Sequence, residues 1–159
     1  MTQESTEATL SMLKDREEIK ALVNRYAHAV WQGDAKTYAS LFAEDGVIRE
    51  TGLGISREIR GQANLEALAA NVSGTRKLRP LVHNHVIDNI ADGHATGYAY
   101  VEVFDIIQDF AKSSVGYYSD EYVKNAGVWV FQRRHLTFVW GSPQFLEWGR
   151  AHSVSPSAA

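Results

Sequence analysis

The feature that most constrains this fold is a change in the spacing of apolar residues along the chain. Up to about residue 72, apolar side chains recur three and four positions apart, which is typical of amphipathic helices. From about residue 81 onward they recur at every second position, which is typical of strands. Helices that precede strands, without alternating with them, predict an α+β fold and argue against a Rossmann-type sheet.

Three helices are expected before the strands begin. Gly33 is suited to end the first helix, because glycine readily adopts the left-handed conformation found after a helix. Asp34 is suited to cap the second helix with its carboxylate. The expected elements of this half are helices at about 12–32, 35–44 and 62–72, a short strand at 47–50 and an irregular segment at 51–59.

The second half of the chain predicts an antiparallel meander. Tight-turn signals at Asp92-Gly93 and Asn125-Ala126-Gly127 join long runs with a period of two. The expected strands are 81–90, 95–107, 114–124 and 128–140.

The last expected strand is apolar on both faces. One face carries Trp129, Phe131 and Val139, and the other carries Val128, Val130, Leu136, Phe138 and Trp140. One face should pack on the helices. The other must also be covered from water, since soluble monomers rarely expose a large apolar patch. We therefore expect a homo-oligomer, a dimer or trimer, through the outer sheet face. In the alternative, the C-terminal segment with Phe145, Leu146 and Trp148 folds back over that face.

Length and composition predict one small soluble domain. The 159 residues suit a single domain, expected over 11–150, between a flexible N-terminus at 1–10 and a flexible tail at 151–159. The absence of cysteine excludes disulfides and thiolate chemistry, and the net charge of −3 gives no basic surface for nucleic acid or an anionic membrane. The polar start of the chain and the lack of a long apolar stretch predict a cytoplasmic location.

Several stretches in order resemble one known group of proteins. They are Arg16 to Tyr26, Gly33-Asp34, Leu41 to Gly46, His83 to Ile87, Ala95 to Gly97, Gly116 to Tyr122, Gly127 to Trp129, and Arg133-Arg134. Over about residues 12–140 the chain resembles the SnoaL-like branch of the NTF2-like superfamily. The resemblance implies a cone-shaped fold, in which N-terminal helices pack within a strongly curved antiparallel sheet around a deep, mostly apolar pocket. It also implies acid–base chemistry without a metal or organic cofactor.

The resemblance implies two classes of function. The first is a cofactor-independent lyase or isomerase, of the dehydration, elimination or deformylation type, acting on a small apolar molecule, aromatic or polycyclic, by His/Tyr chemistry. The alternative is a non-catalytic small-molecule-binding or assembly module, such as a dioxygenase small-subunit-like protein. Fold alone does not distinguish them.

His83 and His85 are the candidates for the general base that the resemblance implies. They lie two residues apart on an expected strand, so both should face the same side. Imidazole accepts protons near neutral pH, although a hydrogen-bonded structural histidine is the alternative. A His-x-His pair could also bind a metal, but no third ligand stands at a recognisable spacing. We therefore expect no metal site.

The resemblance also assigns roles to residues on the helices and strands. Tyr26 is either a hydrogen-bond donor to the substrate or a core aromatic residue. Trp31 stands where related dehydratases have an aspartate, and we expect it to wall the pocket and stack on a flat ring. Val103 replaces a second acid, and Asp105 either substitutes for that acid or lies at the pocket rim.

Three more residues complete the candidate site. Tyr118 could bind the substrate and help Tyr26 stabilise negative charge. Asp120 and Arg134 could pair across adjacent strands, in a structural or a substrate-binding role.

Overall fold

A computed structural model of the chain describes residues 2–154. The helices are α1 (Gln3–Gln32), α2 (Ala35–Ser40), α3 (Gln62–Ala70), the π-helical turn η1 (Asn71–Thr75) and α4 (Pro143–Ala151). The strands are β1 (Phe42–Gly52), β2 (Ile55–Arg60), β3 (Leu78–Ala91), β4 (His94–Asp105), β5 (Ala111–Asn125) and β6 (Val128–Gly141). The end of the expected flexible tail, residues 155–159, lies outside the described residues.

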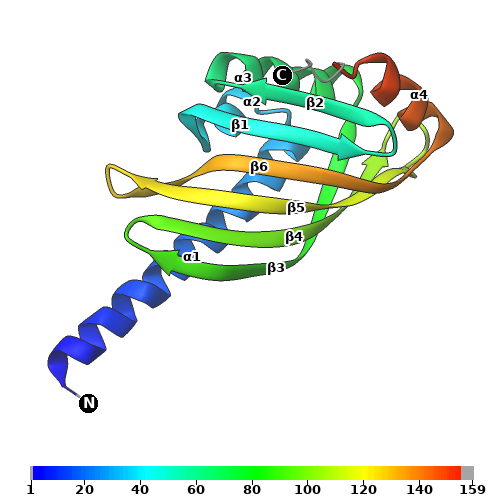
Figure 1. The fold of residues 1–159 in the computed structure, drawn as a ribbon. Coiled ribbons are helices and arrows are strands. Elements are labelled where there is room, and N and C mark those ends of the chain that lie inside the picture. Colours follow the sequence, from blue (N-terminus) through cyan, green and yellow to red (C-terminus); the bar gives the residue numbers. More distant parts are fainter. Residues whose placement is uncertain (1, 155–159) are drawn as a thin grey trace.

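The predicted α+β class is confirmed. The six strands form one sheet in the order β2-β1-β6-β5-β4-β3, with β3 to β6 as the expected antiparallel meander. Strand β1 pairs in parallel with β6 and turns back antiparallel into β2, where an irregular segment was expected. Figure 1 shows the sheet curving around the C-terminal part of α1, with α2 and α3 at one end of the molecule.

The first helix extends further toward the N-terminus than expected. Its C-terminal half is buried at Ile19, Leu22 and Tyr26, whereas residues 3–14 are exposed. Figure 1 shows this N-terminal part projecting beyond the sheet. Asp15 marks the boundary, because its Oδ1 accepts hydrogen bonds from Lys124 (2.7 Å) and Trp129 (2.8 Å). The segment at 1–10, expected to be flexible, is helical from Gln3 onward.

A bulge in β3 overturns one expectation from the sequence. The strand register shifts between His83, which pairs with Tyr100, and Val86, which pairs with Tyr98. Asn84 has a φ of 50° at this point, in the left-handed region. An extra residue in a strand reverses the alternation of side chains. The prediction that His83 and His85 face the same side is therefore wrong.

A second bulge, in β6, changes the faces of the last strand. Arg133 pairs with Glu121 and Phe131 pairs with Tyr122, so Gln132 is the extra residue. Trp129 and Phe131 before the bulge are buried, and so are Leu136 and Phe138 after it. The predicted division into two apolar faces was wrong, because the bulge brings these four residues to the interior.

The helix α4 closes one end of the fold. Ser142 accepts a hydrogen bond from the backbone of Phe145 (3.3 Å), and Pro143 stands in the first turn, where a missing N–H costs nothing. Phe145 is buried, with its ring 4.8 Å from that of Phe138. The C-terminal segment therefore packs into the interior, and the alternative in which it covers the outer sheet face is wrong.

None of the helices within residues 2–154 combines the length and the apolar character that crossing a membrane requires.

Glycines permit the close approach of strands that the curved sheet needs. A Cβ added at Gly97 would lie 2.3 Å from the carbonyl oxygen of Val86, beside the bulge in β3. A Cβ at Gly116 would lie 2.4 Å from the carbonyl oxygen of Thr137. Both contacts are backbone contacts, which cannot yield by a side-chain rotation.

We predict that Gly97→Ala destabilises the fold by about 1–3 kcal/mol, because the new methyl group forces β3 and β4 apart. The free energy of unfolding in urea measures this effect. Gly74→Ala is the matched control, since a Cβ at Gly74 meets nothing within 4 Å. Equal stability of the two variants would contradict the close approach.

The homo-oligomer through the outer sheet face stays a prediction. That face exposes Tyr98, Tyr100 and Tyr117, whose rings follow one another at centroid distances of 6.3 Å. We expect light scattering after gel filtration to give a dimer or trimer mass for the wild type. Tyr100→Glu should lower that mass, because it places a charge in the apolar patch. A monomeric wild type would rule the interface out.

Candidate functional site

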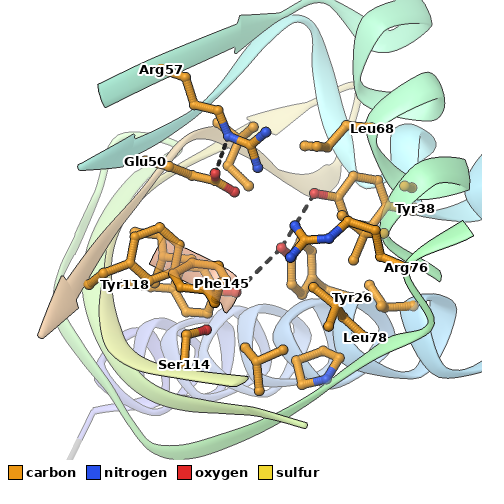
Figure 2. Close-up of a pocket in the computed structure, with 18 residues that line it drawn as sticks. Tyr26, Tyr38, Glu50, Arg57, Leu68, Arg76, Leu78, Ser114, Tyr118 and Phe145 are labelled. Carbon is orange, nitrogen blue, oxygen red and sulfur yellow. Dashed lines mark hydrogen bonds and ion pairs between the residues drawn. The ribbon is translucent and has the colours of Figure 1, made fainter. Parts of the chain in front are cut away.

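A cavity of about 60 Å³ lies between α1, α3, η1 and the inner face of the sheet, and it adjoins a groove of about 290 Å³ that shares Arg76 and Phe145 with its wall. Much of its wall is apolar, with side chains that include Val30, Ile48, Leu68, Leu78, Leu136 and Phe138. The wall also carries hydroxyl and charged groups, which Figure 2 shows directed into the same space. A mostly apolar pocket with a few convergent polar groups is the usual form of a small-molecule site.

Three tyrosines form a hydrogen-bonded cluster in the cavity wall. The hydroxyl of Tyr26, on α1, lies 3.3 Å from that of Tyr38 and 3.4 Å from that of Tyr118. All three residues are buried. Burial raises the pKa of each phenol above its ordinary value, because the anionic form loses hydration. The cluster therefore stays protonated near neutral pH, as a group of hydrogen-bond donors.

A buried ion pair packs against the rings of this cluster. Arg134 donates from Nε and Nη2 to the two oxygens of Asp120, both at 2.9 Å, and both side chains are 0% exposed. The guanidinium carbon lies 3.7 Å from the ring centroid of Tyr118, 4.2 Å from that of Tyr26 and 4.4 Å from that of Phe131. These distances place a permanent positive charge against the faces of the three rings.

Arg134 keeps its positive charge despite its burial. Loss of hydration alone lowers the pKa of Arg134, but Asp120 and the neighbouring phenols outweigh it, and the pKa is raised overall. Nη1 of Arg134 has no hydrogen-bond partner among residues 2–154, so the aromatic rings take the place of one.

His85 reaches the ion pair through a tyrosine. Tyr122 donates its hydroxyl proton to Oδ2 of Asp120 (3.0 Å), and Nε2 of His85 lies 3.0 Å from the same hydroxyl. Since Tyr122 has only one proton to give, His85 donates to it from Nε2. Burial lowers the pKa of His85 below its ordinary value.

A second polar group lies at the other wall of the cavity. Glu50 on β1 is 7% exposed and forms an ion pair with Arg57 on β2. The ring of Trp148, on α4, lies 4.7 Å from the guanidinium carbon of Arg57 and 3.6 Å from that of Arg76. Burial, and next the charge of Arg57, lower the pKa of Arg76 to about 10. Arg76 therefore stays charged near neutral pH.

The structure brings some of the predicted site residues together. Tyr26 and Tyr118 line the cavity, and Arg134 lies directly behind them, paired with Asp120. His85 lies on the inner side of β3 but reaches only the far end of that ion pair.

The other predicted site residues lie apart from the cavity. His83 is on the outer face, with its Nε2 3.3 Å from Glu102. Trp31 is 37% exposed and donates from its indole to the carbonyl oxygen of Pro80 (2.7 Å), so it does not wall the cavity as expected. Asp105 lines the groove next to the cavity, and its Oδ1 accepts hydrogen bonds from the backbone of Ile107 (2.9 Å) and Gln108 (3.3 Å).

Sequence reasoning missed several polar groups of the cavity wall. Glu50 and Arg57 carried a signal, because each shares the period-two phase of a buried isoleucine two positions before it, Ile48 and Ile55. Arg76 carried no such signal, since it follows the irregular turn η1.

Groups of three or more histidine, aspartate or glutamate side chains that could hold a metal ion do not occur within residues 2–154.

The chain matches the model of one known protein family. The model of a family described as the SnoaL-like domain matches residues 11–135. No curated protein matches the chain in sequence.

Solved structures with the same fold include three with different descriptions. An NTF2-like protein with a cystatin-like fold from Novosphingobium aromaticivorans has a TM-score of 0.76 at 23% identity, covering 94% of this chain and 96% of that one. The hexachlorocyclohexane dehydrochlorinase LinA type 2 has a TM-score of 0.71 at 20% identity, covering 85% and 92%. A candidate beta subunit of an aromatic-ring-hydroxylating dioxygenase from N. aromaticivorans has a TM-score of 0.70 at 14% identity, covering 86% and 97%. At these identities the likeness shows the fold alone, which is the predicted NTF2-like one.

We predict that Asp120→Asn destabilises the protein by about 3–5 kcal/mol, because it leaves the buried charge of Arg134 without compensation. Replacement of both partners, as Asp120→Leu with Arg134→Met, should recover much of this loss. Urea unfolding followed by circular dichroism measures the free energy of unfolding of the wild type, the single variant and the double variant. Glu17→Gln is the control, since its pair with Lys20 is exposed and should have little effect. A double variant no more stable than Asp120→Asn would contradict this account.

Proposed function

Because this chain belongs to the SnoaL-like family, we propose that it is a cofactor-independent lyase or isomerase acting on a small apolar molecule, aromatic or polycyclic, inside the cavity. The observation that carries the proposal is that one carboxylate, that of Glu50, and a cluster of protonated phenols line the same apolar cavity. A proton acceptor and a group of neutral donors are what proton transfer next to a carbonyl requires.

The proposed reaction begins with transfer of a proton from a substrate carbon to Glu50. The carbon lies next to a carbonyl group, whose oxygen gains negative charge as the C–H bond breaks. The tyrosine cluster donates a hydrogen bond to that oxygen from the hydroxyl whose proton is not used within the cluster, and the phenols stay neutral because burial raises their pKa values. The protonated Glu50 then returns the proton, to a leaving hydroxyl in a dehydration or to a second carbon in an isomerisation.

The proposed general base is a carboxylate and not one of the expected histidines. Among residues 2–154, the cavity wall includes no histidine, and Glu50 is its one carboxylate. Glu50 therefore replaces His83 and His85 as the proposed proton acceptor. The proposed role of His85 is to position the reacting groups, since it reaches Tyr26 and Tyr118 through Tyr122 and the ion pair behind them.

One observation favours the non-catalytic alternative, a binding or assembly module. Val103 lines the cavity, so the position at which related dehydratases carry an acid contributes only an apolar surface here. Under this alternative the cavity binds its ligand and releases it unchanged.

We predict that Glu50→Gln lowers the turnover rate by about 10²- to 10⁴-fold with little change in substrate binding, because it removes the proton acceptor and keeps the shape. Incorporation of deuterium from D₂O into a panel of aromatic ketones and β-hydroxyketones, followed by mass spectrometry, measures the proton transfer. Glu58→Gln, an exposed change on β2, should leave it unaffected. Exchange that persists in Glu50→Gln would remove Glu50 from this role, and no exchange in the wild type would favour the binding module.

A further inference from the structure

The cavity wall has an imbalance of charge that the proposed reaction does not use. Glu50, Arg57 and Arg76 are the charged side chains that line it among the described residues. Glu50 and Arg57 neutralise one another as an ion pair. Arg76 has no ion pair, and its guanidinium makes no hydrogen bond within residues 2–154. One positive charge therefore remains in a largely apolar cavity.

Arg76 is held in a way that leaves its hydrogen-bonding edge available. Its guanidinium carbon lies 3.6 Å from the ring centroid of Trp148 and 5.8 Å from that of Phe145, both on α4. Stacking of this kind occupies the flat face of a guanidinium, while its N–H groups point outward in the plane. Figure 2 shows the Arg76 side chain extending over the cavity.

The groups on the other side of Arg76 offset its charge only in part, because Asp105 acts on it from a distance and no carboxylate forms an ion pair with it among the described residues. A groove next to the cavity is lined by Arg76 together with Asp105 and Lys112. Asp105 forms no ion pair with Arg76 and uses Oδ1 to bind two backbone N–H groups. Lys112 is paired with Glu102. The groove therefore has no anion in contact with the guanidinium.

The unpaired positive charge of Arg76, at the wall of a largely apolar cavity, favours an anionic ligand. Burial, and next the nearby Arg57, lower the pKa of Arg76 to about 10, so the free protein holds this charge at a cost. A carboxylate that binds Arg76 would remove that cost and form two parallel charge-assisted hydrogen bonds. A monoanion matches the single excess charge, and a flat carboxylate fits beside the stacked guanidinium.

We propose that Arg76 binds the carboxylate of the ligand, so that the cavity selects small carboxylic acids with an apolar, ring-bearing body. The body would lie against Leu78 and Leu136, between Arg76 and the tyrosine cluster. This inference rests on the proposed function, since it names the substrate class for the same cavity.

The test compares acids with amides of the same shape. The probes are benzoate, trans-cinnamate and 2-naphthoate with benzamide, trans-cinnamamide and 2-naphthamide, and isothermal titration calorimetry measures the dissociation constants. We expect at least one acid to bind the wild type roughly 10- to 100-fold more tightly than its amide. Arg76→Gln should abolish the preference, and Arg76→Lys should keep part of it, because ammonium retains the charge without the fork.

Arg60→Gln is the matched control, because Arg60 is exposed on β2 and, within residues 2–154, pairs only with Glu58. It should keep the full preference for the acid. Circular dichroism confirms that each variant is folded. An equal affinity for acids and amides, no binding of any acid, or a preference that survives in Arg76→Gln would overturn the proposal.

Binding and turnover separate this inference from the proposed function. Turnover of neutral ketones by a wild type that shows no preference for acids would leave the lyase or isomerase standing and remove the role of Arg76. Binding of acids that depends on Arg76, without proton exchange in any ligand, would keep the carboxylate site and remove the catalytic function.

Discussion

The fully buried ion pair between Asp120 and Arg134 is the interaction on which the site depends. It joins β5 to β6, and the guanidinium carries the rings of Tyr26 and Tyr118 on its faces. Burying two charges is costly, and the structure offsets that cost with two hydrogen bonds and three aromatic rings. Because so many partners meet at one point, the phenol hydroxyls in the cavity wall have little freedom to move.

The sequence was sufficient to predict the order of the elements but not the faces of two strands. Alternation in β4 and β5 predicts the meander correctly, because the one register shift between these strands, at Ser113, lies close to the end of their pairing. The bulges at Asn84 and Gln132 each add a residue that looks no different from its neighbours. They put His83 on the outer face and reverse the phase of β6, so the facing of these side chains was predicted wrongly. Tyr26, Tyr118 and the Asp120–Arg134 pair were predicted correctly to lie together, since their placement depends on which elements are neighbours.

The cavity wall among the described residues combines many hydrogen-bond donors with one carboxylate. The phenols and the two guanidinium groups present N–H and O–H bonds to a ligand, whereas Glu50 alone presents carboxylate oxygens. A ligand rich in oxygen atoms can satisfy this wall, but a ligand rich in amines cannot. If Arg76 binds a carboxylate as proposed, the orientation of the ligand follows, with the carboxylate at the arginine end and a neutral carbonyl oxygen at the tyrosine end.

The division of α1 at Asp15 gives one helix two different stabilities. Residues 16–32 are fixed by packing, so their amide hydrogens should exchange with solvent only when the whole domain opens. Residues 3–14 have no such packing and continue the helix from a turn that is already formed, which spares them the cost of nucleation. We therefore expect this outer part to fray and re-form within microseconds or less while the packed part of the helix, which lines the cavity, stays in place.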